Sequence, residues 1–438
     1  MWRDDLRLSR FVFSSGFCVA LFLGIMLSPW KSFGQIALGQ AKFLGNAVSL
    51  PIPSSYLIYW DQIVPAGWGK WGSVASSSSD TSTWNWGPLD QIYNYAMTNG
   101  ISFKEHNLVW GQQQPSWISS LDSAHQYQMV ETWIRLCGER YPEAAMVDVV
   151  NEPLHDTPMA LNPVPYYKAL GGAGATGWDW VITAFTLARQ YFPNAKLLLN
   201  DYFILSSPTL SSQSEVVQYR TIIDLLKQRN LIDGIGCEGH FMEQTDTNTI
   251  RTNLNYLAAS GLPIYITEYT VDEASDATQL AVYQKQFPIF WTHPDVKGVT
   301  LWGYIQGNVW TQTPNCYLIR SDSTMRPALQ WLINYIEENP AGVKDTDARL
   351  PLDYALEQNY PNPFNPTTVI SYRLPNVSNV ALKIYDVLGR EVATLVNGRQ
   401  AAGYNNITFN AANLPSGVYF CKIVAEKFSS MRKLLLMK

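Results

Sequence analysis

Between residues 43 and 338 the chain alternates strand-like and helix-like segments, and no other feature limits its fold as strongly. Short apolar runs typical of buried strands lie at 101–105, 145–150, 196–200, 233–237, 264–267 and 297–301, with weaker runs at 44–49 and 62–64. Amphipathic runs with helical spacing lie at 178–192, 215–229, 249–259 and 280–291. Eight strand–helix units in about 300 residues favour an α/β fold closed as a (β/α)8 TIM barrel over an open sheet.

The last hundred residues follow a different pattern. A chain of 438 residues exceeds the roughly 250 to 300 residues at which one hydrophobic core stops growing, so more than one domain is expected. A linker is predicted at 339–353, where Pro340 and Gly342 precede a charged stretch. Short alternating runs follow at 367–374, 380–386, 391–396, 406–409, 417–424 and 431–437. They predict a small all-β, Ig-like sandwich over 354–438.

The N-terminus has the features of a secretory signal peptide. Arg3, Arg7 and Arg10 precede an apolar stretch at 11–27, and small residues precede a cleavage point after Gly34. We therefore expect residues 1–34 to be removed. The alternative is an uncleaved anchor, although the stretch is short for a span of about 20 residues.

Composition narrows the function classes. The net charge of -5 gives no sign of a nucleic-acid partner. Aromatic residues make up 13% of the chain, and their faces are good platforms for the apolar faces of sugar rings. The cysteines beyond the signal peptide show no metal or disulfide spacing, so neither a zinc site nor a disulfide framework is indicated, and one isolated bridge stays an alternative. They are Cys137, Cys237, Cys316 and Cys421.

Two glutamates each stand where a short apolar run ends: Glu152 in MVDVVNEP and Glu268 in PIYITEY. Catalytic groups of parallel barrel enzymes sit at the C-terminal ends of strands. Two carboxylates at such positions make glycoside hydrolysis the first chemistry to consider. For either glutamate taken alone, a salt-bridge partner at a strand end is the alternative.

Six segments in order resemble the signature of glycoside hydrolase family 10, the retaining endo-β-1,4-xylanases. They are HNLVWGQQQPSW (106–117), VDVVNEP (147–153), LLLNDY (197–202), GIGCEGH (234–240), ITEY (266–269) and TLWGY (300–304). The resemblance implies a catalytic barrel, which we place at 40–338, with Glu152 as acid/base on strand four and Glu268 as nucleophile on strand seven. This chemistry needs no metal or cofactor.

The same resemblance implies a set of substrate contacts. Asn151 would hydrogen-bond the sugar 2-hydroxyl, a contact that strengthens in the transition state. His240 would contact the nucleophile. The other substrate-binding residues are Lys70, His106, Trp110 and Gln113 on the non-reducing side, Tyr202 and Glu238, and Trp302 and Trp310 as walls near the cleaved bond. A core role is the alternative for each His and Trp considered singly.

The sequence also departs from the family pattern. Ala66 and Gly67 replace a Glu-Asn pair, Gly111 a histidine, Glu238 a glutamine and Thr270 an aspartate. These changes put subsite affinity and pH optimum in doubt. If Glu238 is ionised close to Glu152, repulsion should raise the pKa of the pair. The alternative is that Glu238 faces a cation or solvent.

The C-terminal segment resembles a second family, the sorting domain of the type IX secretion system of Bacteroidetes-like bacteria. The matching stretches are EQNYPNPFNPTTVISY (357–372), KIYDVLGREVATLV (383–396), LPSGVYF (414–420) and KLLLMK (433–438). The resemblance implies recognition by secretion machinery. A carbohydrate-binding sandwich is the alternative, disfavoured because this segment has no Trp.

Together these features predict a secreted or cell-surface monomeric enzyme acting on xylan or a related β-1,4-linked polysaccharide. One rival is a β-glycanase on another β-1,4 polymer or on xylo-oligosaccharides. Another is a catalytically weak sugar-binding protein at the cell surface, against which the two carboxylates argue.

Overall fold

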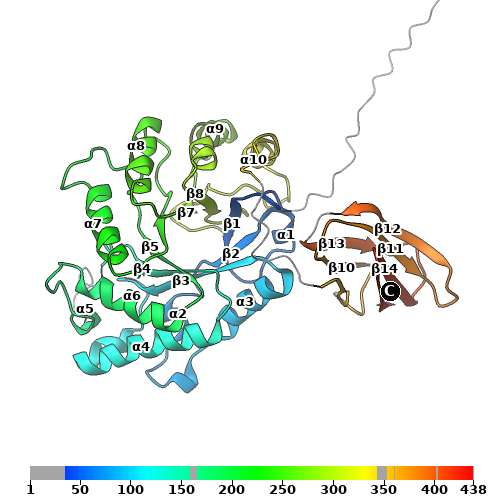
Figure 1. Cartoon of the computed structure of the whole chain (residues 1–438), viewed down its shortest axis with the longest axis horizontal. Coiled ribbons are helices and arrows are strands. Elements are labelled where there is room, and N and C mark those ends of the chain that lie inside the picture. The colour runs from blue at the N-terminus through cyan, green and yellow to red at the C-terminus, as the bar shows by residue number, and fades with distance from the viewer. Residues whose placement is uncertain (1–34, 158–164, 343–352, 360, 401–402, 438) are drawn as a thin grey trace, which may run out of the picture. The chain divides into compact units, whose positions relative to one another are not determined.

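Eight parallel strands close into a barrel in the order β1 to β8, with β8 paired to β1 (Figure 1). The computed structural model describes residues 35–157, 165–342, 353–359, 361–400 and 403–437. The predicted signal peptide and most of the predicted linker lie outside these residues. The strands are β1 (Phe43–Val48), β2 (Gln62–Pro65), β3 (Ser102–Val109), β4 (Met146–Asn151), β5 (Lys196–Asn200), β6 (Gly234–Cys237), β7 (Ile264–Tyr269) and β8 (Val296–Leu301). The predicted TIM barrel is confirmed.

Helices surround the barrel and pack their apolar faces onto it. They are α1 (Tyr56–Tyr59), α2 (Trp71–Val74), α3 (Gly87–Asn99), α4 (Ser123–Arg140), α5 (Pro165–Ala169), α6 (Asp179–Tyr191), α7 (Glu215–Lys227), α8 (Thr247–Ala258), α9 (Asp276–Thr292) and α10 (Pro327–Glu338). In α7 the buried residues Val216, Tyr219, Ile223 and Leu226 recur at helical spacing and form one face. At the start of α8, the Asp246 carboxylate accepts hydrogen bonds from two backbone N–H groups and caps the helix.

Most predicted elements match the observed ones within a few residues, but β3 is longer than its apolar run. It continues from the predicted end at 105 to Val109, through His106 and Asn107. The extension is polar because its inward side chains bond inside the barrel. Within the extension, His106 Nδ1 lies 2.9 Å from the Asp148 carboxylate of β4. A rule based on apolar residues alone cannot recognise such a strand.

The C-terminal segment forms two antiparallel sheets, in agreement with the predicted small all-β domain. One sheet has the order β13-β10-β9 and the other β12-β11-β14-β15. Their strands are β9 (Ala355–Leu356), β10 (Thr367–Leu374), β11 (Ser378–Tyr385), β12 (Glu391–Gln400), β13 (Gly403–Asn410), β14 (Gly417–Ala425) and β15 (Phe428–Leu436). Residues of both sheets, such as Ile370 and Leu382, share one hydrophobic cluster, as in a sandwich.

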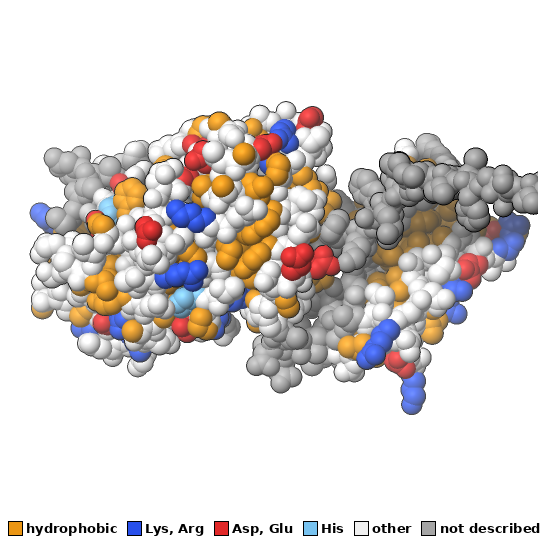
Figure 2. Space-filling model, turned by 90° about the horizontal axis from the view of Figure 1, so that it is seen from above, with side chains coloured by type: hydrophobic (Ala, Val, Ile, Leu, Met, Phe, Trp, Pro, Cys, Tyr) orange, Lys and Arg blue, Asp and Glu red, His pale blue; other side chains and the backbone are white. Residues whose placement is uncertain are grey.

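Three further observations concern the cysteines, the surface charge and the length of the helices. Each of the four cysteines in the described part of the chain is buried and free. On the face drawn in Figure 2, acidic and basic side chains are interspersed and neither sign forms a continuous field. Among the described residues, no helix has both the length and the apolar character needed to cross a membrane.

Candidate active site

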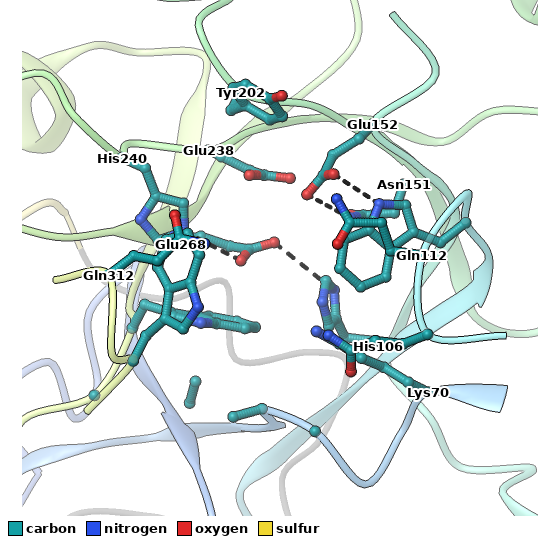
Figure 3. Close-up of a pocket in the computed structure, with 18 of the residues that line it drawn as sticks. Lys70, His106, Gln112, Asn151, Glu152, Tyr202, Glu238, His240, Glu268 and Gln312 are labelled. Atoms are coloured by element: carbon teal, nitrogen blue, oxygen red, sulfur yellow. Dashed lines mark hydrogen bonds and ion pairs between the residues drawn. The ribbon is translucent and has the colours of Figure 1, made fainter. Parts of the chain in front are cut away.

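A cavity of about 650 Å³ brings together every side chain proposed from the sequence as catalytic or substrate-binding. Its residues come from the ends of the barrel strands and the loops that follow them (Figure 3). The proposed residues that line it are Lys70, His106, Trp110, Gln113, Asn151, Glu152, Tyr202, Glu238, His240, Glu268, Trp302 and Trp310.

Glu152 directly follows β4 and is held by both backbone and side-chain bonds. Its φ of 54° is left-handed, and its N–H donates to the Asn200 carbonyl at 2.7 Å. Trp110 Nε1 donates to one carboxylate oxygen at 2.6 Å and Asn151 Nδ2 to the other at 3.0 Å. Burial, a hydrogen bond with Asp156 and repulsion from Glu268 raise the pKa of Glu152 to about 10. Glu152 therefore carries a proton at neutral pH, the form that a general acid needs.

Glu268 lies in β7 and has the opposite protonation state. Its carboxylate is 3.3 Å from His240 Nε2 and 3.8 Å from His106 Nδ1, and it accepts from Asn200 Nδ2 at 2.9 Å. Burial alone would raise its pKa, but His106, His240 and Lys104 outweigh burial and lower the pKa to about 2. Glu268 is therefore an ionised carboxylate, the form that a nucleophile needs.

Burial shifts the pKa of two basic groups of the site, His106 and Lys70. Burial lowers the pKa of His106, although Glu268 and Asp148 oppose this effect. This shift favours the neutral imidazole. Lys104 is a further basic group close by, paired with Asp148 at 2.5 Å. Burial also lowers the pKa of Lys70, whose ammonium lies 4.5 Å from the centre of the Trp110 ring.

Asn200, at the end of β5, contacts three side chains of the site. It was not predicted from the sequence as a site residue. Its Nδ2 lies 2.8 Å from Asn151 Oδ1, 2.8 Å from Glu238 Oε1 and 2.9 Å from Glu268 Oε1. An amide nitrogen has only two hydrogens, so these three acceptors share them. Asn200 pairs in register with Asn151, and a polar residue ending an apolar strand was the sequence signal that could have identified it.

Glu238 follows β6 and is buried, with 2% of its surface exposed. Burial, then repulsion from Glu268 and from Glu152, raise its pKa well above the usual range. This shift favours the neutral form of Glu238. Repulsion from Glu238 is not among the main causes of the raised pKa of Glu152, so the hypothesis that an ionised Glu238 raises the pKa of the acid/base stays a prediction. The solvent-facing alternative is wrong, because the carboxyl group accepts a hydrogen bond from buried Asn200.

Two other departures from the family pattern have local explanations. A Cβ atom at Gly111 would lie 2.1 Å from the Asp156 carbonyl oxygen, so a histidine would not fit here without moving that segment. Thr270 Oγ1 lies 2.9 Å from His240 Nδ1 and gives this imidazole a neutral hydrogen-bond partner.

The first two residues of the loop after β2 present no polar side chain to the cavity. Ala66 and Gly67 both line the cavity, and a Cβ at Gly67 would meet nothing within 4 Å. Trp68, in the same loop, packs against the barrel core and is not among the residues that line the cavity.

One group of side chains has the spacing of a metal site. Donor atoms of Glu238, His240 and Glu268 lie within 4.8 Å of one another. His240 Nε2 already faces the Glu268 carboxylate, and burial favours the neutral form of Glu238. A protonated carboxyl is a poor cation ligand, so this donor set does not fit a resident metal well.

Comparison with known proteins agrees with the fold and shows the family. Residues 31–335 match the model of glycosyl hydrolase family 10, and residues 358–437 match that of the secretion system C-terminal sorting domain. Endo-1,4-beta-xylanase B of Cellvibrio japonicus is 40% identical over 297 residues, which cover 67% of this chain and 45% of that protein. Endo-1,4-beta-xylanase 3 of Hypocrea jecorina is 25% identical over 279 residues, covering 63% of this chain and 75% of that protein.

Solved structures show the same barrel. Native xylanase 10B from Thermotoga maritima superposes with a TM-score of 0.60 at 24% identity, covering 70% of this chain and all of that one. A xylanase 10B from Thermotoga petrophila, solved with xylobiose, superposes with a TM-score of 0.59 at 22% identity, covering 70% and 97% of the two chains. The present chain spans less than half of the length of the Cellvibrio japonicus relative.

Proposed function

Because this chain belongs to glycosyl hydrolase family 10, we propose that it is an endo-β-1,4-xylanase that cleaves with retention of configuration. The observation that carries the proposal is the opposite protonation of two carboxylates facing one cavity, Glu152 neutral and Glu268 ionised. Environments that push two carboxyl pKa values apart assign the acid and the base roles. The xylanase names of the relatives point to xylan as the substrate.

In the proposed first step, the Glu268 carboxylate attacks the anomeric carbon and forms a glycosyl ester as the glycosidic C–O bond breaks. Glu152 gives its proton to the departing oxygen. In the second step, the Glu152 carboxylate removes a proton from water, which attacks the same carbon and releases Glu268. Each step inverts the configuration, so the product keeps that of the substrate.

Neighbouring side chains fit this mechanism. Asn151 lies beside Glu152 and donates to it, so its amide can also face the 2-hydroxyl of the reacting sugar. Asn200 and His240 hold the Glu268 carboxylate by one oxygen each, which fixes the direction of attack.

We further infer export and release, or display, at the cell surface. The match to the sorting domain over 358–437 supports type IX secretion. Removal of residues 1–34 by a signal peptidase and a monomeric state belong to the same proposal.

NMR of freshly hydrolysed xylan tests the reaction. We expect the β-anomer of the new reducing end to appear first and to equilibrate later with the α-anomer. An initial α-anomer would contradict retention. Products from another β-1,4 glycan but none from xylan would favour the related β-glycanase, and binding without hydrolysis would favour the sugar-binding protein.

A further inference from the structure

Two phenylalanines at the mouth of the cavity leave much of their surface exposed to water. Phe203 is 39% exposed and Phe241 is 42% exposed, and both line the cavity. Other large rings of the barrel are packed inside, for example Phe185 and Phe287, which are fully buried. Exposed rings at the edge of a ligand cavity present apolar surface that a ligand can cover.

The backbone sets both rings in the same way. Phe203 follows Tyr202 just beyond β5, and Phe241 follows His240 just beyond β6. Their φ values are 58° and 56°, in the left-handed region that bulky residues seldom adopt. Such residues cluster at functional sites because the surrounding structure must hold them there.

The two rings complete an aromatic band along one rim of the cavity. Ring centres are 4.9 Å apart for Tyr202 and Phe203, 6.3 Å for Phe203 and Phe241, and 5.9 Å for Phe241 and Trp310. Phenyl rings offer no hydrogen-bonding group, so this part of the rim can hold a sugar only by its apolar face.

The position of the band relative to the acid/base indicates which part of the substrate it meets. Figure 3 shows Tyr202 at the end of the site near Glu152 and Glu238, while Lys70 lies at the opposite end of the view. A general acid lies on the side of the leaving group that it protonates. Phe203, in contact with Tyr202, therefore lies on the leaving-group side.

We propose that Phe203 and Phe241 form an apolar platform that binds a leaving-group-side sugar of the polysaccharide chain. This platform rests on the proposed glycosidase function. The sugar is held by contact with its ring face, so the platform does not discriminate between hydroxyl patterns. Its main effect is to set which glycosidic bond of an oligosaccharide lies next to the two carboxylates.

Variants Phe203→Ala, Phe241→Ala and the double variant test the platform with xylohexaose and 4-nitrophenyl β-xylobioside, whose leaving group lacks further sugars. For each variant we compare kcat/KM for xylohexaose with kcat/KM for the nitrophenyl substrate. We expect the ratio of the first to the second to fall about fivefold for each ring that is removed, because apolar contact with the sugar is lost. The fall should come mainly from a higher KM for xylohexaose. The cleavage pattern of xylohexaose should shift toward bonds that leave fewer sugars on the leaving-group side. Phe203→Tyr should restore the ratio.

Leu210→Ala is the matched control, because Leu210 is 49% exposed and is not among the residues lining the cavity. An unchanged ratio and pattern in the double variant would overturn the proposal, and so would equal losses on both substrates. Calorimetric binding of xylohexaose in a Glu268→Ala background gives a readout that does not depend on turnover. If the parent enzyme hydrolyses neither substrate, the proposed function fails, while weaker binding in the double variant would still support the platform.

Discussion

At the scale of single residues, Glu268 has the environment of a nucleophile. Glu268→Ala should lower hydrolysis by several orders of magnitude, because no other group can form the glycosyl ester. Azide can occupy the space left by the carboxylate and attack the same carbon in one step. We therefore expect azide to restore cleavage of an activated β-xylobioside and to give the α-glycosyl azide, identified by NMR. An unchanged rate without azide would remove Glu268 from the mechanism.

Glu152 acts as an acid only while protonated, so its raised pKa predicts activity that persists into alkaline pH. The hydrogen bond with Asp156 is the second cause of that rise after burial. Asp156→Asn removes a negative charge and should shift the basic limb of the kcat/KM profile to lower pH, while the acidic limb, set by Glu268, moves little. An unmoved basic limb would show that burial and repulsion from Glu268 set the pKa of Glu152 without Asp156.

Glu238→Gln is the matched comparison, because burial raises the pKa of Glu238 and favours its neutral form. In that form the substitution removes no charge near Glu152, so we expect both limbs of the profile to stay in place. A basic limb that moved to lower pH would mean that Glu238 is ionised in solution and raises the pKa of Glu152 by repulsion, as the sequence-based hypothesis assumed.

At the scale of elements, the loop between β2 and α2 carries Ala66 and Gly67, whose side chains cannot hydrogen-bond a sugar. Ala66→Glu combined with Gly67→Asn should raise kcat/KM on xylotriose and longer substrates about fivefold, because each new hydrogen bond contributes roughly 0.5 to 1.5 kcal/mol. The open space at Gly67 accommodates the new amide side chain. The new glutamate replaces Ala66, which packs in an apolar cluster with Trp302 and Trp310, so its carboxylate has to turn away from that cluster.

Gly67→Asn alone separates these two effects. A gain from the single substitution and none from the pair would indicate that the glutamate disturbs the tryptophan wall. No gain from either variant would show that the loop does not face a bound sugar.

Strand positions and the two carboxylates could be predicted because a buried parallel strand leaves a strong apolar pattern that ends at a polar residue. Asn200 also ends such a run, but this signal alone does not reveal its role, and Asp156 lies in a loop outside any strand pattern. Asn200 gains its role from Asn151 of β4, Glu238 just after β6 and Glu268 of β7. Asp156 gains its role from a loop whose backbone carbonyl accepts a hydrogen bond from the Gly111 N–H. Pairing across a barrel is long-range in sequence, so local patterns do not encode it. The same limit applies to the protonation of Glu238, which depends on burial.

At the scale of the whole molecule, the chain contains separate hydrophobic cores. The buried cluster of the barrel and that of the C-terminal sheets share no residue. The change in sequence pattern near residue 339 predicted this division, because helical periodicity stops there and short alternating runs follow. A domain with its own core can fold independently, so catalysis and export can be assigned to different parts of the chain.

This division leads to a test with the chain shortened after residue 342. All residues lining the cavity lie between Ala47 and Gln312, so kcat/KM on xylo-oligosaccharides should change by less than about twofold, and the purified barrel should keep a cooperative thermal transition. In a host with a type IX system, the shortened protein should stay inside the cell envelope, while the full chain reaches the medium or the surface. Glu268→Ala in the full chain is the matched control, because it should lose activity without losing export. Export of the shortened protein would contradict a sorting role for the C-terminal sheets, and loss of its activity would show that those sheets support the barrel.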